Sequence, residues 1–236
     1  MGFGLPISTP FSLLTVMSPV DICNQALAHI GDRRISNIDE AAQLSDPLAY
    51  YCSQFYVLSK NQVLAAQRWT FAKKAAALSR RTGVISLGFT YVHALPVDCI
   101  RVMNLVRGSI PSGETEPTYG STRIDKFKIV GRDVWSNYEH VALYYVCKAE
   151  DPTFWTPHFA AAVSRLLAHY LAGAVANDPR LAREHLDIYE RVALPNAQFY
   201  DAVQDESGEN HVDSRETSPT LLARRDASGG INEPDI

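Results

Sequence analysis

Several common sequence signals are missing from this chain, and each absence removes a class of protein. No run approaches eighteen apolar residues, so no membrane-spanning helix is expected. The seven histidines include no HExxH, and the chain contains neither GxSxG nor a GxxxxGK phosphate loop. A zinc protease site, a nucleophile elbow and a nucleotide cradle are therefore unsupported. We predict that the protein is not an enzyme and binds neither a cofactor nor a metal.

Cysteine is also scarce. The four thiols, Cys23, Cys52, Cys99 and Cys147, are far apart in the sequence and form no CxxC pair. Two fall in predicted helices and two in predicted strands, where apolar neighbours abound. The pattern favours buried free thiols and fits a reducing compartment.

A strongly basic character is absent as well. The composition is that of a globular protein, with 46% apolar and 20% charged residues and a net charge of -4. From Asp201 onward nine acids face three arginines, whereas the first 200 residues hold 19 bases and 17 acids. A near-neutral body with an acidic tail lacks the electrostatic footprint of a protein that binds duplex DNA.

The most prominent positive feature is a long amphipathic helix over 46–70. Asp46 is suited to the N-cap and Pro47 to the first helical position. A repeat of three and four residues places a mostly apolar stripe on one side of this helix. Its members are Leu48, Tyr51, Phe55, Leu58, Gln62, Ala65 and Trp69. Such a helix needs partners along its length.

The rest of the chain supplies them. Periodicity predicts further helices over about 19–30, 157–176 and 179–204, the last bent or interrupted by Pro195. Residues 83–150 predict a β-rich antiparallel insert, with a hairpin turn near Gly131 and a central strand over 141–147. We therefore expect an α+β, mainly helical fold. Two helix pairs flank the insert and close into a four-helix bundle.

The two ends lie outside this core, which we place at 18–206. Residues 1–17 are apolar, contain Pro6 and Pro10, and carry no basic residue. We interpret them as an N-terminal extension, or as residues that precede a true start at Met17. Residues 207–236 hold almost no core-forming side chains. They predict an extended C-terminal arm, disordered when alone.

The order of several motifs resembles the tail tubular protein A group, the head-to-tail adaptor proteins of short-tailed bacteriophages. The residues that carry the resemblance are Ala26-Leu27-Ala28-His29-Ile30-Gly31, Arg68-Trp69-Thr70-Phe71-Ala72, Ala94-Leu95-Pro96-Val97-Asp98-Cys99-Ile100-Arg101-Val102 and Tyr189-Glu190. The resemblance covers roughly 18–205. Pro195 departs from it, and residues 1–17 have no counterpart.

The resemblance implies a structural virion protein, assembled in the host cytoplasm and located at the head-tail junction. Twelve copies would form a ring between the portal and the tail nozzle, with double-stranded DNA passing through its centre without sequence reading. We expect the arm to reach the portal through Leu221 and Leu222, next to Arg224 and Arg225. The β insert, with its long loop over 108–122, is expected to face the nozzle protein.

Two alternatives from other classes remain open. A tail-associated cell-wall hydrolase would need a carboxylate pair, for which Glu184 with Glu190, or Glu114 with Glu116, are the candidates. A helical DNA-binding regulator would use the 19–30 and 46–70 helices. The link between those helices is long for a helix-turn-helix.

Overall fold

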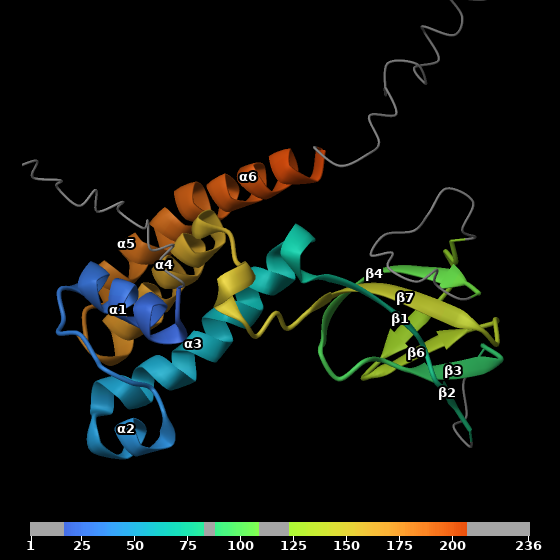
Figure 1. The fold of residues 1–236 in the computed structure, drawn as a ribbon, viewed down its shortest axis with the longest axis horizontal. Helices are drawn as coiled ribbons and strands as arrows, with labels where there is room; N and C mark the ends of the chain where they lie inside the picture. Colours follow the sequence, from blue (N-terminus) through green and yellow to red (C-terminus); the bar gives the residue numbers. More distant parts are fainter. Residues whose placement is uncertain (1–16, 83–87, 109–122, 207–236) are drawn as a thin grey trace, which may run out of the picture.

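The fold combines helices with two antiparallel sheets in a computed structural model that describes residues 17–82, 88–108 and 123–206 (Figure 1). The predicted arm over 207–236 and residues 1–16 of the predicted extension lie outside these ranges. Helix exceeds strand, 52% against 21%, so the expectation of a mainly helical α and β fold is confirmed. The helices and the sheets occupy opposite ends of the molecule.

The helical part contains residues from both ends of the described chain. From the N-terminal side come α1 (Pro19–Ile30), α2 (Glu40–Ser45) and α3 (Pro47–Ala66), followed by the short helix η1 (Thr70–Ala72). After the strands come η2 (Pro152–Phe154), α4 (Pro157–Ala174), α5 (Pro179–Ile188), the π-helical turn η3 (Tyr189–Ala193) and α6 (Leu194–Glu206). A side-chain cap begins each of the helices α1 to α5 and the turn η2. The cap of α1 is a complete capping box between Ser18 and Asp21.

The central helix is α4, not the 46–70 helix that the sequence pattern suggests. It contacts α1, α3, α5, η3 and α6. Its buried face mixes bulky residues such as Phe159 and Leu167 with alanines at 160, 162, 168 and 172. Small side chains allow several helices to approach one helix closely, which explains why α4 takes the centre.

The predicted 46–70 helix is wrong in its end and in its buried face. α3 stops at Ala66, and Gln67 is already extended. The predicted stripe includes Leu58, which is 42% exposed, and Gln62, which is exposed and accepts a 2.8 Å hydrogen bond from the Tyr170 hydroxyl. Leu48 and Trp69 of the predicted stripe are buried, but the other buried residues of α3 lie outside it: Ala49, Cys52, Tyr56, Ser59, Lys60, Val63 and Leu64.

Trp69 explains why the helix ends early. Its indole N–H donates to the Val63 carbonyl at 2.8 Å, and the side chain is fully buried. Continuing the helix would place Trp69 on the face that carries Gln62, away from the core. Leaving the helix after Ala66 lets the indole fold back against the end of α3, where burial of a large aromatic outweighs a lost helical turn.

Pro195 does interrupt the last predicted helix, as expected, and the interruption is a π turn. The N–H of Leu194 donates to the carbonyl of Tyr189, five residues back. Proline has no N–H and its ring crowds the preceding turn, so one wider turn accommodates it without ending the helix. The helical direction continues into α6 with a change of register.

The strands form two antiparallel sheets. In the first, β1 (Lys73–Ala77) and β4 (Cys99–Arg107) flank β7 (Val141–Cys147). In the second, the order is β2 (Arg80–Arg81), β3 (Tyr91–Ala94), β6 (Asp133–Ser136) and β5 (Lys128–Val130). The expected central strand is confirmed, since every residue of β7 is buried. Strand structure begins at Lys73, earlier than the predicted start at 83.

The predicted hairpin near Gly131 is present as β5 and β6. Val130 pairs with Asp133, which leaves a loop of Gly131 and Arg132. Gly131 has a φ of 60°, in the left-handed region that two-residue hairpin loops need and that glycine adopts without strain.

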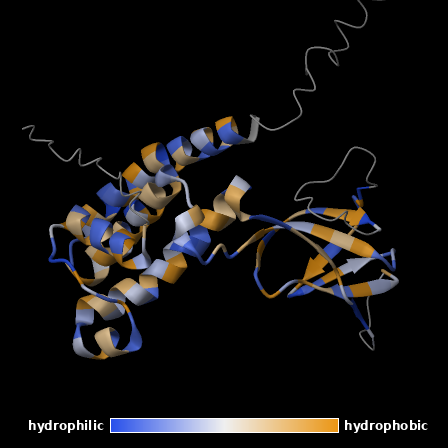
Figure 2. Cartoon of the chain, viewed as in Figure 1, coloured by the Kyte–Doolittle hydropathy of each residue, from blue (hydrophilic) through white to orange (hydrophobic). Residues whose placement is uncertain are grey.

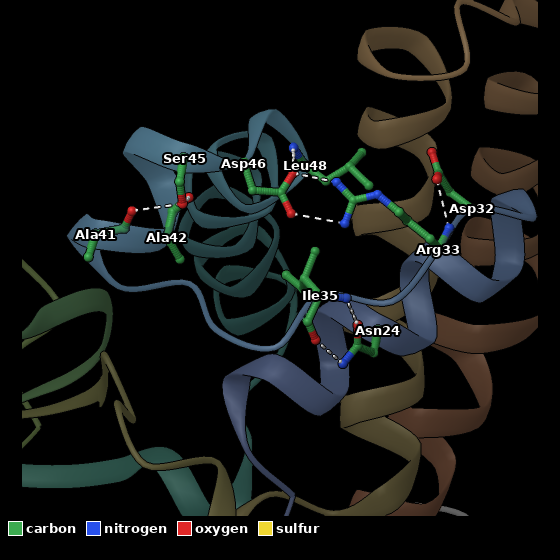
Figure 3. A network of polar contacts seen from close by, with 9 residues as sticks. All are labelled: Asn24, Asp32, Arg33, Ile35, Ala41, Ala42, Ser45, Asp46 and Leu48. Atoms are coloured by element: carbon green, nitrogen blue, oxygen red, sulfur yellow. Dashed lines mark hydrogen bonds and ion pairs between the residues drawn. The ribbon is translucent and has the colours of Figure 1, made fainter.

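A polar network fixes the link between α1 and α3 (Figure 3). The buried Asn24 donates to the Ile35 carbonyl at 3.0 Å and accepts from the Ile35 N–H at 2.8 Å. Arg33 donates both terminal nitrogens to Asp46, at 2.8 and 3.0 Å, and Asp46 also caps α3 at Leu48. Bidentate pairing and capping use the same carboxylate, so the link is held to the start of α3.

Candidate functional site

The predicted portal-binding residues Leu221, Leu222, Arg224 and Arg225 lie outside the described residues, as do Glu114 and Glu116. The other carboxylate pair is described. Glu184 and Glu190 are both exposed, and they lie on α5 and η3. Between them, Asp187 pairs with Arg191 at 3.9 Å. This is a solvated helix surface with interleaved charges.

The junction between the helices and the sheets is the most elaborately bonded place in the described chain. The Asp201 carboxylate of α6 is buried and accepts from the main-chain N–H of Thr70 at 3.1 and 3.2 Å. It also accepts from the Thr70 hydroxyl at 2.8 Å. The last described helix is thereby attached to η1, the turn through which α3 passes into β1.

Two further polar contacts bridge the same junction. Lys60 of α3 is almost fully buried and pairs with the mostly exposed Glu150, which follows β7. Arg101 of β4 donates to the Ala65 carbonyl at 3.1 Å. The C-terminal half of α3 is therefore tied to β4 and to the segment that follows β7.

An aromatic cluster forms the apolar centre of the junction. Phe159 of α4 meets Trp69, Phe71 and Trp155 edge-on, with ring centroids 4.8 to 4.9 Å apart. This geometry places positive ring edges against negative ring faces. The cluster joins α4, η1 and the segment that returns from the sheets, so the helical part and the β part are held as neighbours.

Hydrophobic and hydrophilic residues alternate along the helices (Figure 2). Two of the helices, α3 and α6, each carry three exposed large apolar or aromatic side chains. On α3 these are Tyr50, Val57 and Leu58, which are 48, 50 and 42% exposed. On α6 they are Phe199, Tyr200 and Val203, which are 63, 47 and 46% exposed. Isolated exposed apolar residues need no explanation, but repeated ones along a helix mark a surface suited to contact.

Charge is distributed unevenly between the two parts. Residues 73–148, which contain all the strands, hold eleven Lys and Arg against six Asp and Glu, a net of +5. The near-neutral body expected from the whole-chain count is therefore a basic β part beside an acidic helical part. Counting charges in windows along the sequence would have revealed this.

Several basic side chains pair with nearby carboxylates. Arg33 pairs with Asp46, Lys74 with Asp98 at 2.9 Å. In the second sheet, Arg80 pairs with Glu139 at 3.1 Å, and Arg81 pairs with Asp133 at 3.3 Å. These exposed pairs contribute little to stability, but they neutralise the acids of the β part.

What remains is a surface that we call the hairpin patch. It comprises exposed basic and apolar residues around the β5–β6 turn and the neighbouring 95–97 segment. Two hydrogen bonds join these segments. The Leu95 N–H donates to the Arg132 carbonyl at 2.9 Å, and the Arg132 side chain donates to the Pro96 carbonyl. The members are Lys126, Lys128, Ile129, Val130, Arg132 and Val97.

Three histidines gather between α1, α4 and α5. The rings of His29 and His185 are 6.0 Å apart, and His169 bonds the Ala182 carbonyl at 2.8 Å. Burial, with the nearby Arg165, lowers the pKa of His29 to about 4 and also lowers the pKa of the buried His185. Neither ring nitrogen of His185 has a well-formed hydrogen bond, although the His29 main chain lies close enough to oppose the shift.

Metal ligands do not converge there. No group of three or more His, Cys, Asp or Glu side chains suited to a metal occurs within 17–82, 88–108 and 123–206. The cysteines, distant in sequence, approach in two pairs. Cys99 lies opposite Cys147 in the first sheet. The thiols of Cys23 and Cys52 share a hydrogen bond, which, together with burial, raises the pKa of the Cys23 thiol. All four are free, and Cys99 alone is partly exposed.

No protein-family model matches the chain. No curated protein matches it either. In the part of the chain that the structure describes, no helix is long and apolar enough to span a membrane.

Proposed function

We propose that the chain is a structural virion protein, a head-to-tail adaptor whose copies form a ring between the portal and the tail nozzle. The observation that carries this proposal is the presence of exposed apolar surfaces on two different helices, α3 and α6. A ring needs head-to-tail contacts, and such contacts join two unlike surfaces of the same chain. A twofold dimer would need only one.

The finer architecture belongs to the same proposal. The helices α1, α3 and α4 with the α5–α6 pair act as a four-helix bundle, a rigid wedge suited to side-by-side packing. Residues 207–236 form an extended arm that orders on the portal, with Leu221 and Leu222 as apolar anchors beside Arg224 and Arg225. The β part faces the nozzle protein, and the DNA passes through the centre of a twelve-fold ring.

Ring formation is tested by negative-stain imaging of the full-length protein with and without portal rings. We expect rings on the portal. The charge-introducing variants Leu58→Glu and Phe199→Glu should abolish them while circular dichroism stays unchanged. Leu44→Glu is the matched control, because Leu44 is 86% exposed on α2 and belongs to neither surface. Failure of the wild-type protein to bind or assemble on the portal would overturn the proposal.

The two attachment surfaces are tested separately. Deleting 207–236 should abolish portal binding, and undiminished binding would show that the arm is not the portal contact. Shortening the 108–122 loop should block attachment of the nozzle protein while leaving portal attachment intact. Loss of both contacts after loop shortening would indicate misfolding instead of a nozzle surface.

A further inference from the structure

The hairpin patch combines three properties. Lys126, Lys128 and Arg132 supply positive charge. Ile129 and Val130, which are 44 and 39% exposed, supply apolar area, as does the 82% exposed Val97. The third property is an open strand edge, since β5 is the last strand of its sheet in the described residues.

The register of the hairpin defines which main-chain groups are open. Val130 and Asp133 flank the two-residue loop and form a hydrogen-bonded pair. Bonding alternates along an antiparallel ladder, so the N–H and C=O of Ile129 point away from β6. An extended peptide placed there would gain main-chain hydrogen bonds, contacts to the apolar side chains and ion pairs with the lysines.

The acids of the β part leave this positive charge unopposed. Asp98 pairs with Lys74 and accepts from Tyr145, and Asp133 pairs with Arg81. Asp125 pairs with Arg123 at 3.3 Å. Among the described residues, these three carboxylates are each paired with a base outside the patch, and we expect the patch to attract an acidic ligand.

We propose that residues 226–236 of the unassembled chain dock on the hairpin patch of the same chain. This segment holds Asp226, Glu233 and Asp235, has no Lys or Arg, and contains Ile231 and Ile236. Its acids complement the three bases, and its isoleucines complement the exposed apolar side chains. The contact goes beyond the adaptor role, because it involves neither the portal nor a ring.

The connecting chain has a long reach. Figure 1 shows α6 running toward the end of the molecule that carries the sheets, so the tether starts on that side. Nineteen residues, 207–225, separate α6 from the docking segment. A flexible chain of that length has a root-mean-square span of roughly 25 Å and a contour of roughly 65 Å. Tethering gives an effective concentration on the order of millimolar, enough for a weak ion-paired contact to form.

An acidic peptide fits the patch better than nucleic acid does. A phosphate backbone would pair with the lysines but would leave Ile129, Val130 and Val97 without apolar contacts. A peptide that carries both acidic and apolar residues, as 226–236 does, satisfies both. Docking of this kind weakens with salt, because the pairs are exposed.

The test compares full-length proteins. In the tail-neutral variant, Asp226→Asn, Glu233→Gln and Asp235→Asn remove the three charges and leave the chain length unchanged. We expect the amide of Ile129 to exchange at least about tenfold faster in this variant than in the wild type. A labelled peptide of the sequence 222–236 should bind the tail-neutral protein at least about tenfold more tightly than the wild type, whose own segment competes.

Two matched variants locate the contact. In the tail-neutral background, Lys128→Glu should abolish peptide binding, and Arg183→Glu, an equal charge change exposed on α5, should not. Equal exchange of Ile129 in the wild type and the tail-neutral protein would overturn the proposal. So would protection that rises with protein concentration, which indicates a second copy. Binding of a short DNA duplex, but not the peptide, through Lys128 would reassign the patch to nucleic acid.

Discussion

Removing the Asp201 carboxylate should loosen the attachment of α6 to the junction. Asp201 is 2% exposed and accepts three hydrogen bonds from Thr70, two of them bifurcated from one N–H. Asp201→Ala leaves that N–H and the hydroxyl without their acceptor. Leaving such groups unpaired costs about 1–3 kcal/mol each, so we expect a loss of about 3 kcal/mol in the free energy of unfolding. Asp201→Asn keeps one acceptor oxygen and should lose about half as much.

A double-mutant cycle isolates the contact. Thr70→Ala removes the hydroxyl but keeps the N–H, so its coupling to Asp201→Ala should be about 1–2 kcal/mol. Stability is measured by urea unfolding, followed by far-ultraviolet circular dichroism and tryptophan fluorescence. The control is Asp187→Ala on α5, whose pair with Arg191 is exposed and long at 3.9 Å, with an expected change below about 0.5 kcal/mol. A loss below about 1 kcal/mol for Asp201→Ala, together with no coupling, would refute the reasoning.

Two further stability predictions concern α1. Asn24→Ala frees both main-chain groups of the buried Ile35, so we expect a loss of about 2–4 kcal/mol in urea unfolding, and an unchanged midpoint would contradict it. The pKa values of His29 and His185 are lowered in the folded protein, so folding favours the neutral rings. Their contribution to the free energy of unfolding is therefore complete above pH 6.5, the unfolded pKa, and is lost as the pH falls toward about 4. Stability measured at a series of pH values should fall over that range by on the order of 1–2 kcal/mol for the pair. A double His→Gln variant that keeps the same pH dependence would exclude them as its source.

Local signals in the sequence predicted several elements correctly. A serine followed by proline defines the start of α1, and Ser18 with Asp21 needs only three residues of chain to cap it. Gly131 permits the hairpin because the required backbone angle is a property of one residue. The unbroken apolar run over β7 predicts a strand buried on both faces. In each case the cause and the structure lie within one element.

The candidate surfaces were less accessible from sequence. The net charge of the β part could have been counted, but the hairpin patch depends on which acids are engaged elsewhere. Asp98 and Asp133 are both close to the patch in the chain, yet their carboxylates pair with Lys74 and Arg81 on other strands. Pairing between strands follows from register, and no local pattern specifies it.

The sequence by itself determined where α1, α3, α4 and α5 begin, because a capping side chain and a proline act on the main chain beside them. Only the tertiary structure decided which face of α3 is buried and where that helix ends. Periodicity allowed a stripe through Leu58 and Gln62, but Trp69 had to reach Phe159, and this contact ended the helix at Ala66. A helix face is chosen by what packs against it. For α3 the packing partners are α4, with which it shares its buried face, and the strands that return to its end.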